Sequence, residues 1–586
     1  MDILWSSSTT MRNPERAYPF LKTIAEIDGN EWNEENQSKL QILLIKNRFY
    51  IPTSINLSKE QVKILEDLSY EMSFEEAEGI FYSKKYVDPP MRGRTSFDPV
   101  EKLGLVQLYH NKIRVTDFGY MFLNGEIDLG DVVFTNLLKY QLPNPLASGN
   151  NDYNTKPFIN ILRLIRRVNE LCLEKKLKPV GISKEEFGIF ALSIKSYLEV
   201  EEKANTLINF RQEKASKKTQ DEKKQYVDSF IEQYLSNFQN PVKNYREYAD
   251  NIIRYIRLTK YIYIRGNGYY IDLEPRRMIE IESILKNDNG SILNFTKEEY
   301  KKYISDYNAY ILPFQTVESL KIIANNILNE INNNEIKLSL DKTEELIKSE
   351  VSELKFQIQN FRNKRTMLQN LLLKQQYKEV SQIDIAIEAL TNIHSLGLKP
   401  SIALEKWSNI ALNIINDAKL IKPNAPMGDD NEPTFTAPAG VSDIECYYKS
   451  FSAICEVTML KSRDQWYNEG QPVMRHLREF EQENLNDSYC LFIAPTLHID
   501  TINTFWTAVK YEYQGKKQRI VPITINQLIK ILNVVKMLKN NRKNLSHNDI
   551  KDLYNDCIQI ESLSDSTHWN EHINKSICKW QDRLLT

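Results

Sequence analysis

The strongest constraint on the fold comes from an alternation of short segments near the carboxyl end. A polar stretch rich in proline and glycine, residues 421–442, precedes two runs of β-forming residues, 444–448 and 451–458. Helical and β-forming patterns then alternate as a helix over 472–483, a strand over 489–494, a helix over 500–511 and a strand over 519–525. A hairpin followed by alternating helices and strands is typical of an α/β unit. We therefore predict an α/β domain with a mixed sheet over residues 396–586.

Helical patterns surround this unit. An amphipathic helix is expected over 403–420, and the tail from Gln527 onward is expected to be mostly helical. Further upstream, apolar residues recur at alternating steps of four and three, and Arg365 interrupts the series. The members of this heptad stripe are Ile347, Val351, Leu354, Ile358, Phe361, Leu368 and Leu372. The stripe predicts a long helix in a helical linker over 291–395, packed within the chain or, as the alternative, in an intermolecular coiled coil.

The amino-terminal half carries two hairpin patterns. Residues 102–116 read as two alternating runs around a polar turn, with Thr116 or Asp117 as the cap of a following helix. A second hairpin is expected over 261–273, where Gly266 and Gly268 suit a tight turn. Helices followed by such hairpins predict winged-helix-like subdomains over residues 1–150 and 151–290. The whole chain is thus expected to be a multidomain α+β protein.

Composition excludes several classes of protein. The 586 residues leave room for roughly three or four domains. No run of about 18 apolar residues occurs, and the first residues are polar, so neither a membrane helix nor a signal peptide is expected. The six cysteines form no C-x-x-C pair, which is typical of free thiols in a reducing compartment. We expect a cytoplasmic protein, and the net charge of −2 is an average over several domains.

Two acidic residues stand out in the predicted hairpin. Asp443 lies just before its first strand, and Glu456 lies inside the apolar run of its second strand. A carboxylate in an apolar run needs a partner or a metal, because burial without one costs several kcal/mol. If the two strands are neighbours, the two side chains converge on one cation, and Mg²⁺ suits such a pair. Taken singly, Asp443 is explained as a turn or cap residue and Glu456 as an ion-paired glutamate.

An acidic residue, a hairpin and then (D/E)-x-K form the core of PD-(D/E)xK nucleases. Here the pattern reads Ser-Asp-Ile-Glu from residue 442 and Glu-Val-Thr from residue 456. Together with Pro-Val-Met-Arg-His-Leu from 472 and Tyr-Cys-Leu-Phe-Ile-Ala-Pro from 489, it resembles the AlwI/BstNBI family of type IIS restriction and nicking endonucleases. Weaker similarity occurs at 104–105, 113–116, 254–259 and 265–267, so the resemblance covers most of the chain.

The resemblance implies roles for matching positions. Asp443 and Glu456, with the carbonyl oxygen of Val457, would hold Mg²⁺, and Glu469 would be a third acidic residue needed for cleavage. Glu405 matches a helical glutamate that completes such sites, although an exposed helix carboxylate explains it equally well. His476 lies on the helix after the hairpin, either beside DNA phosphate or as an ordinary helical histidine. The implied reaction is hydrolysis of a phosphodiester that leaves a 5′-phosphate.

Two departures from the superfamily pattern matter. Ser442 replaces a proline, and Thr458 replaces the lysine that orients the attacking water in many such nucleases. The resembled family shares the threonine-type ending, so activity is still expected. Lys461 is a candidate substitute for the missing lysine, and a surface lysine is the simpler explanation.

Positive charge gathers in two stretches of the amino-terminal half. Residues 156–178 hold seven cations against two acids, and residues 243–277 hold eight against four. Arginine suits both phosphates and guanine edges. A solvated basic face is the alternative for any single residue. The predicted DNA contacts, including two on an expected loop at residues 89–94, are Arg92, Arg94, Arg114, Arg163, Arg166, Arg167, Arg254, Arg257 and Arg265.

These observations lead to one main hypothesis and one alternative. The main one is a Mg²⁺-dependent type IIS endonuclease, or a strand-specific nicking variant, that binds a short asymmetric site in double-stranded DNA and cuts outside it. A second nuclease subunit or a transient dimer would be needed for the second strand, and a cognate DNA methyltransferase would accompany it. The alternative is a non-catalytic DNA-binding regulator with a degenerate nuclease domain, which the missing lysine motivates.

Overall fold

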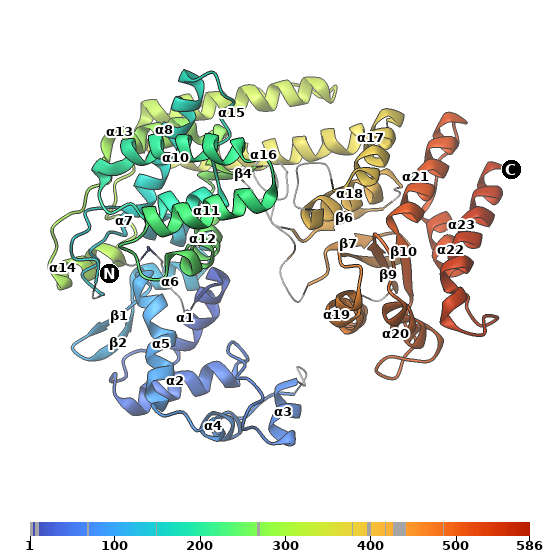
Figure 1. The fold of residues 1–586 in the computed structure, drawn as a ribbon, viewed down its shortest axis with the longest axis horizontal. Coiled ribbons are helices and arrows are strands. Elements are labelled where there is room, and N and C mark those ends of the chain that lie inside the picture. Colours follow the sequence, from blue (N-terminus) through green and yellow to red (C-terminus); the bar gives the residue numbers. More distant parts are fainter. Residues whose placement is uncertain are drawn as a thin grey trace. The chain divides into compact units, whose positions relative to one another are not determined.

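The structure is a computed structural model. It describes residues 4–5, 11–66, 70–147, 149–265, 270–377, 379–394, 400–415, 418–425, 437, 441–484 and 486–586. Contacts within the chain divide it into two compact units (Figure 1). Unit 1 comprises Met1–Tyr263 with Tyr270–Ser319, and unit 2 comprises Leu320–Thr586 with the short piece Ile264–Tyr269. Each unit is described by itself below.

Unit 1 is mainly helical. Its first part packs α2 against α4 and α5, and the last turn of α5 leads into a two-stranded antiparallel hairpin. The elements are α1 (Ala17–Ala25), α2 (Glu34–Lys46), α3 (Lys59–Glu66), α4 (Phe74–Ser83), α5 (Pro89–Lys102), β1 (Val106–Tyr109), β2 (Lys112–Val115), α6 (Asp117–Leu123) and α7 (Leu129–Lys139). The predicted hairpin is confirmed, and its turn residues His110 and Asn111 both have positive φ. Thr116 caps α6 by accepting a hydrogen bond from the Gly119 N–H, as predicted.

The second part of unit 1 surrounds a small sheet. Its elements are α8 (Pro157–Glu174), β3 (Ile182–Ser183), α9 (Lys184–Glu186), α10 (Val200–Ser216), α11 (Gln220–Tyr234), α12 (Pro241–Ile256), β4 (Ile262–Arg265), β5 (Tyr270–Leu273), α13 (Met278–Asn287) and α14 (Lys297–Ser305). The strand order is β3-β5-β4. The two strands of the predicted second hairpin are present as the neighbours β4 and β5, and two-residue β3 joins them on the other side of β5. The predicted turn at Gly266 and Gly268 lies outside the described residues.

Four helices precede the large sheet of unit 2. They are α15 (Val317–Lys337), which begins in unit 1, α16 (Val351–Gln376), α17 (Val380–Thr391) and α18 (Pro400–Ile414). The predicted long helix is α16, and Leu354, Ile358, Phe361 and Leu368 of its heptad stripe are buried. Arg365 is also buried, and its Nη1 lies 3.1 Å from Glu330 Oε2 of α15. The stripe therefore packs within the chain, and Arg365 continues it as a buried cation paired with a partly exposed glutamate.

Unit 2 contains a mixed five-stranded sheet, as predicted. Its strands are β6 (Leu420–Pro423), β7 (Ile444–Tyr447), β8 (Phe451–Val457), β9 (Asp487–Ala494) and β10 (Ile520–Thr524), in the order β10-β9-β8-β7-β6. The β6, β7 and β8 strands are antiparallel neighbours, whereas β8, β9 and β10 run parallel. Parallel strands require crossover helices, which α19 (Arg463–Glu483) and α20 (Ile499–Lys510) provide.

Two predicted boundaries in unit 2 are wrong. Residues 420–423 form an edge strand, so the preceding helix ends at Ile414 and the polar stretch does not begin as a loop. The helix expected from Pro472 begins nine residues earlier, at Arg463, and Pro472 lies inside it. This places Glu469 on a helix that faces the sheet. The remaining loop residues of the 421–442 stretch lie mostly outside the described residues.

Different helices cover the two faces of this sheet. The Phe492 ring contacts Phe505 of α20 at 5.1 Å between centroids, while the Tyr489 ring contacts Tyr554 at 5.7 Å. Residues three apart on a strand point to opposite faces, so α20 lies on one face and the helix of Tyr554 on the other. The last three helices are α21 (Ile525–Asn540), α22 (His547–Ile558) and α23 (Trp569–Leu585).

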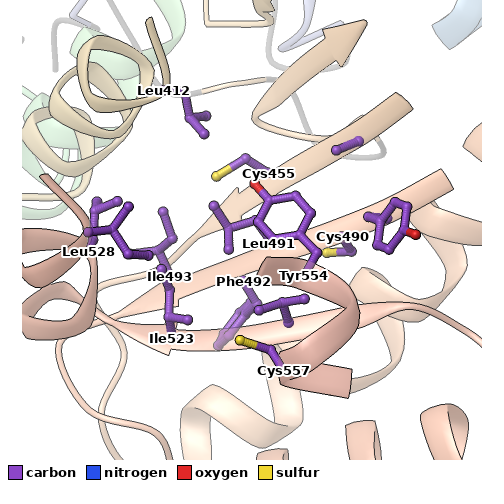
Figure 2. Close-up of a cluster of buried hydrophobic side chains, with 14 of the residues drawn as sticks. Leu412, Cys455, Cys490, Leu491, Phe492, Ile493, Ile523, Leu528, Tyr554 and Cys557 are labelled. Atoms are coloured by element: carbon purple, nitrogen blue, oxygen red, sulfur yellow. The ribbon is translucent and has the colours of Figure 1, made fainter. Parts of the chain in front are cut away.

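The core of unit 2 gathers around the central strands. Figure 2 shows Leu491 and Ile493 of β9 together with Leu528 of α21 and Tyr554 of α22. The cysteines of this core, Cys446, Cys455, Cys490 and Cys557, are free thiols, as predicted. None of the helices that the structure describes is long and apolar enough to cross a membrane.

Candidate active site

The β7–β8 hairpin brings Asp443 and Glu456 together. Ile444 pairs with Cys455 across the hairpin, so Asp443, one residue before β7, lies opposite Glu456. The Asp443 carboxylate also reaches the second strand directly, because its Oδ2 accepts a hydrogen bond of 2.7 Å from the Val457 N–H. This bond fixes the carboxylate of Asp443 against the end of β8. The predicted convergence of the two acids is therefore present in the geometry.

Glu456 is buried and points toward α19. Only 5% of the residue is exposed, and its register partner on β9 is Phe492, on the face that α20 covers. His476 of α19 supplies a partner, since its Nδ1 lies 2.8 Å from Glu456 Oε1 and shares a hydrogen bond with it. The other ring nitrogen, Nε2, has no hydrogen-bond partner among the described residues. The structure thus places His476 against a carboxylate that the sequence assigns to the metal.

Burial and mutual repulsion raise the pKa values of these acids. The pKa of Asp443 stands well above its ordinary value, chiefly because of burial and then because of the charge of Glu456. The pKa of Glu456 is also raised well above its ordinary value by burial and by the charge of Glu469. Raised carboxyl pKa values at one site indicate acids held together without enough positive charge.

Glu469 is the third acid of this cluster. It lies half-buried on α19, and burial raises the pKa of its carboxyl group, while a hydrogen bond with the Thr458 side chain lowers it. Thr458 is buried just past the end of β8, where its N–H donates to the Ile493 carbonyl oxygen over 3.0 Å. The sequence singled out Thr458 only as the replacement of a lysine. Its position eleven residues before Glu469 gave no signal that the two side chains meet.

Glu405 occupies a different position from the other acids. It is buried on α18, and its Oε2 accepts a hydrogen bond of 3.1 Å from the Ala437 N–H. The sequence alternative of an exposed helix carboxylate is therefore wrong. The structure connects Glu405 to the segment before β7, and its membership of a metal site stays a prediction. Lys461 is exposed.

The donor set suits one hard cation. Among the described residues, no group of three or more His, Cys, Asp or Glu side chains stands ready as a closed metal cage. Mg²⁺ does not need such a cage, because it keeps several waters and binds through one or two carboxylates plus phosphate oxygens. Asp443 and Glu456 provide two adjacent carboxylates, and burial, followed by repulsion from neighbouring acids, raises their pKa values, which a bound cation would counteract. The residues present therefore fit Mg²⁺.

The basic stretch on α8 is largely neutralised within unit 1. Arg167 forms ion pairs with Glu201 at 2.7 Å and with Glu174 at 2.8 Å. Arg166 pairs with Glu170 and with Glu282, each at 3.0 Å. Arg163 is half-buried and donates to the Leu285 carbonyl oxygen over 3.5 Å. These arginines hold helices of the unit together, and their contact with DNA stays a prediction.

Arg92, Arg94 and Arg114 are exposed on unit 1. The flexible loop expected for the first two is wrong, because Asp88 caps α5 and the prolines at 89 and 90 begin that helix. Arg92 stacks over the Tyr86 ring at 4.6 Å, and Arg94 pairs with Asp88 at 2.5 Å. Arg114 lies on β2, beside the hairpin turn.

The remaining predicted DNA contacts lie on α12, just after it, and at the end of β4. Arg254 of α12 pairs with Asp250 at 2.8 Å, one helical turn away. Arg257 is half-buried just after α12, and burial lowers the pKa of its guanidinium group. Arg265 is the last residue of β4, and its side chain lies outside what the structure describes.

Comparisons with known proteins identify the family. The profile of the AlwI restriction endonuclease family matches residues 101–531, more than half of the chain. A comparison with curated protein sequences gives no match. Among solved structures, the chain is similar to the small subunit of the heterodimeric restriction endonuclease R.BspD6I, with 19% identity, 33% of this chain and 98% of that chain covered, and a TM-score of 0.29. It is also similar to the BpuJ1 endonuclease binding domain in complex with pyrene- and phenanthrene-modified DNA, with 14% identity, 52% and 96% covered, and a TM-score of 0.31.

The matched segment includes the whole β1–β2 hairpin of unit 1, the whole β7–β8 hairpin and α19 with Glu469 and His476. It therefore spans both units and the cluster of carboxylates. The chain belongs to the AlwI restriction endonuclease family of DNA nucleases.

Proposed function

We propose that this DNA endonuclease is a Mg²⁺-dependent type IIS or strand-specific nicking enzyme, with Asp443 and Glu456 as its metal ligands. The observation that carries the proposal is the meeting of these two carboxylates at the ends of two neighbouring strands, with Glu469 beside them. The family match to the surrounding segment supports a DNA phosphodiester as the substrate of this cluster. Cleavage would leave a 5′-phosphate and a 3′-hydroxyl.

The residues around the cluster have different proposed roles in the reaction. A Mg²⁺ bound by Asp443, Glu456 and the carbonyl oxygen of Val457 would supply Lewis-acid stabilisation of the phosphate charge. His476 Nδ1 holds Glu456 Oε1 and thereby fixes the rotamer of that carboxylate. Thr458 holds Glu469 in the same way, so the Glu469 carboxylate is the group that accepts a hydrogen bond from the attacking water.

Recognition is proposed for unit 1, in winged-helix-like subdomains. The support is the β1–β2 hairpin, whose tip exposes Tyr109, and the exposed guanidinium groups of Arg92, Arg94 and Arg114. Phosphate contacts from such arginines position a protein on the duplex, whereas base-edge contacts give sequence preference. Separate recognition and cleavage units agree with cutting at a fixed distance outside the bound site.

Whether one or both strands are cut depends on a second active site. A single Asp443–Glu456 cluster would cut one strand at a time, so double-strand cleavage would require a second nuclease subunit or a transient dimer. A methyltransferase of the same specificity would protect the host's own sites. The second subunit and the methyltransferase are both proposed because the chain belongs to a family of restriction enzymes.

A plasmid assay tests the proposal. Supercoiled DNA is incubated with the protein and Mg²⁺, and the ends of the products are sequenced. Nicking gives open circles and double cleavage gives linear molecules. Asp443→Asn and Glu456→Gln are each expected to lower cleavage by about a hundredfold to a thousandfold, which is the order of loss when a principal electrostatic group is removed.

The matched control is Glu445→Gln on the same hairpin. The Glu445 carboxylate is bonded to Asn424 and Tyr447 and lies by Lys422, so this change removes the same charge outside the cluster. It should leave cleavage within about threefold of the wild type, a small change on the scale of about 1.4 kcal/mol per tenfold. Cleavage that survives both cluster substitutions would refute the site. Tight DNA binding with no cleavage at all would favour the non-catalytic regulator that Thr458 motivates.

A further inference from the structure

A cation-lined pocket lies in unit 2, away from the carboxylate cluster. The cavity has a volume of about 780 Å³ and is lined by Lys374, Lys539, Arg542 and Lys543, with no acid among its described lining residues. The sequence strengthens this charge, because no aspartate or glutamate occurs between residues 525 and 548. In a chain with a net charge of −2, four cations around one cavity are a marked local excess.

Two of these cations are already held by the protein and two are not. Lys543 Nζ donates to the carbonyl oxygens of Leu584 and Leu585, and Lys539 Nζ donates to that of Tyr377. The side chains of Lys374 and Arg542 have no ion pair and no hydrogen bond within the part of the chain that the structure describes. The pocket therefore presents two unneutralised cations, beside two that are anchored in place.

The rest of the lining is apolar. Ile414, Val535 and Leu538 are buried core residues that also line the cavity, and Val380 and Leu545 complete its apolar surface. A bare phosphate would use only the cations, whereas a nucleotide would also cover apolar surface with its base. The volume exceeds the lower end of the range of small-ligand pockets, about 300–1,000 Å³.

The pocket and Asp443 lie at opposite ends of the strands of the sheet. Pro423 of β6 pairs with Ile444 beside Asp443, whereas Leu420 pairs with Tyr447, so the pocket residue Ala418 lies beyond the other end of β6. The α21 helix begins where β10 ends, at the same end of the strands as Glu456, and the other end of α21 lies at the pocket. The eight residues of β9 correspond to roughly 26 Å at about 3.3 Å per residue. One DNA phosphate cannot serve both sites.

We propose that this pocket binds a nucleotide through its phosphate, separately from the catalytic cluster, with Lys374 and Arg542 as the phosphate ligands. Arginine and lysine are the usual phosphate partners, and arginine gives a two-pronged contact. The phosphate comes either from a free nucleotide or from a nucleotide of a DNA strand. The proposal does not depend on cleavage activity.

Calorimetric titration of the full chain tests it without Mg²⁺, so that cleavage does not interfere. The probes are ADP, inorganic pyrophosphate and a 5′-phosphorylated oligonucleotide of twelve thymidines. ADP is expected to bind, and pyrophosphate is expected to bind more weakly because it leaves the apolar lining uncovered. If saturating oligonucleotide abolishes the ADP heat, the strand reaches the pocket. If the ADP heat is unchanged, the ligand is the free nucleotide, and both results support the site.

Substitutions locate the binding. The double variant Lys374→Glu and Arg542→Glu is expected to weaken ADP at least about a hundredfold, since each lost charged contact is worth roughly tenfold. Both side chains are exposed, so the fold should survive, which a thermal melt checks. The matched control is Lys530→Glu, which changes a cation of α21 that bonds to Asn574 outside the pocket. Equal binding by the double variant and the control would overturn the proposal, and so would the absence of any binding to the three probes at millimolar concentration.

Discussion

Lys139 gives the sharpest test of the electrostatics in unit 1. Its side chain is fully buried at the end of α7, where Nζ donates to the carbonyl oxygens of Ile304 and Asp306 over 2.7 and 2.8 Å. Burial lowers the pKa of this amine from its ordinary value of 10.5 to about 7, against a smaller opposing effect of the Asp306 charge. The ammonium form is thus disfavoured in the fold and favoured in the unfolded chain.

The sign of the effect on stability follows from proton binding. Between pH 7 and 10.5 the unfolded chain keeps the proton of Lys139 while the folded chain releases it, so stability rises with pH across this window. The difference between 10.5 and about 7 corresponds to at most about 5 kcal/mol, at about 1.4 kcal/mol per pKa unit. Between pH 7 and 9, roughly 2–3 kcal/mol of this gain is expected.

The Lys139→Met variant isolates this contribution. Urea unfolding of both proteins is measured at pH 7, 8 and 9, and the difference in the free energy of unfolding is plotted against pH. The lost hydrogen bonds to Ile304 and Asp306 lower the variant's stability by the same amount at each pH. The titration of Lys139, in contrast, changes the slope of this difference against pH. The free energy of unfolding of the wild type, relative to that of the variant, should increase by roughly 1 kcal/mol per pH unit. Parallel profiles would refute the buried, deprotonated amine.

Three further predictions concern the cluster and the packing of unit 1. Addition of 10 mM Mg²⁺ should raise the melting temperature of the wild type by about 2–4 °C and leave the Asp443→Asn/Glu456→Gln double variant unchanged, since ligands stabilise only the state that binds them; an equal rise in both would contradict the assigned ligands. Without Mg²⁺, Glu456→Gln should raise the melting temperature, because it removes a buried charge but keeps the partner of His476; a lower one would contradict the repulsion. Gly93→Ala should lower the free energy of unfolding by about 3 kcal/mol, because the new Cβ would lie 1.8 Å from the Gln37 carbonyl oxygen. Gly79→Ala meets nothing within 4 Å and should raise the free energy of unfolding by about 0.5–1 kcal/mol, and urea unfolding measures both changes.

Patterns of alternation predicted the strands of unit 2 well, and proline explains where they failed. Pro423 ends β6, and a proline on an edge strand is allowed because its missing N–H faces no neighbour. Pro472 lies in the middle of α19, although proline usually begins a helix. At α5 the same preference was the missed signal, since Asp88 followed by two prolines is a helix start.

The site was predictable only as far as local spacing reaches. The twelve residues between Asp443 and Glu456 contain most of a hairpin, and its register follows from the pattern of the strands. The contacts of His476 with Glu456 and of Thr458 with Glu469 depend on how α19 packs on the sheet, which no local spacing reveals. The positive charge of residues 156–178 suggested a DNA-binding surface for a related reason. The acids that pair with its arginines, Glu201 and Glu282, come from distant positions in the sequence.

The hairpin register has a consequence for how related chains can change in length. Strand side chains alternate between faces with a period of two, so one residue inserted at Lys449 or Ser450 would turn Glu456 away from α19 or shift it from its place opposite Asp443. Either change would separate the two carboxylates while leaving the sheet itself foldable. Insertions before Asp443 carry no such penalty, because they leave the pairing of β7 with β8 intact. Variation in length is therefore expected upstream of the hairpin, and a fixed length within it.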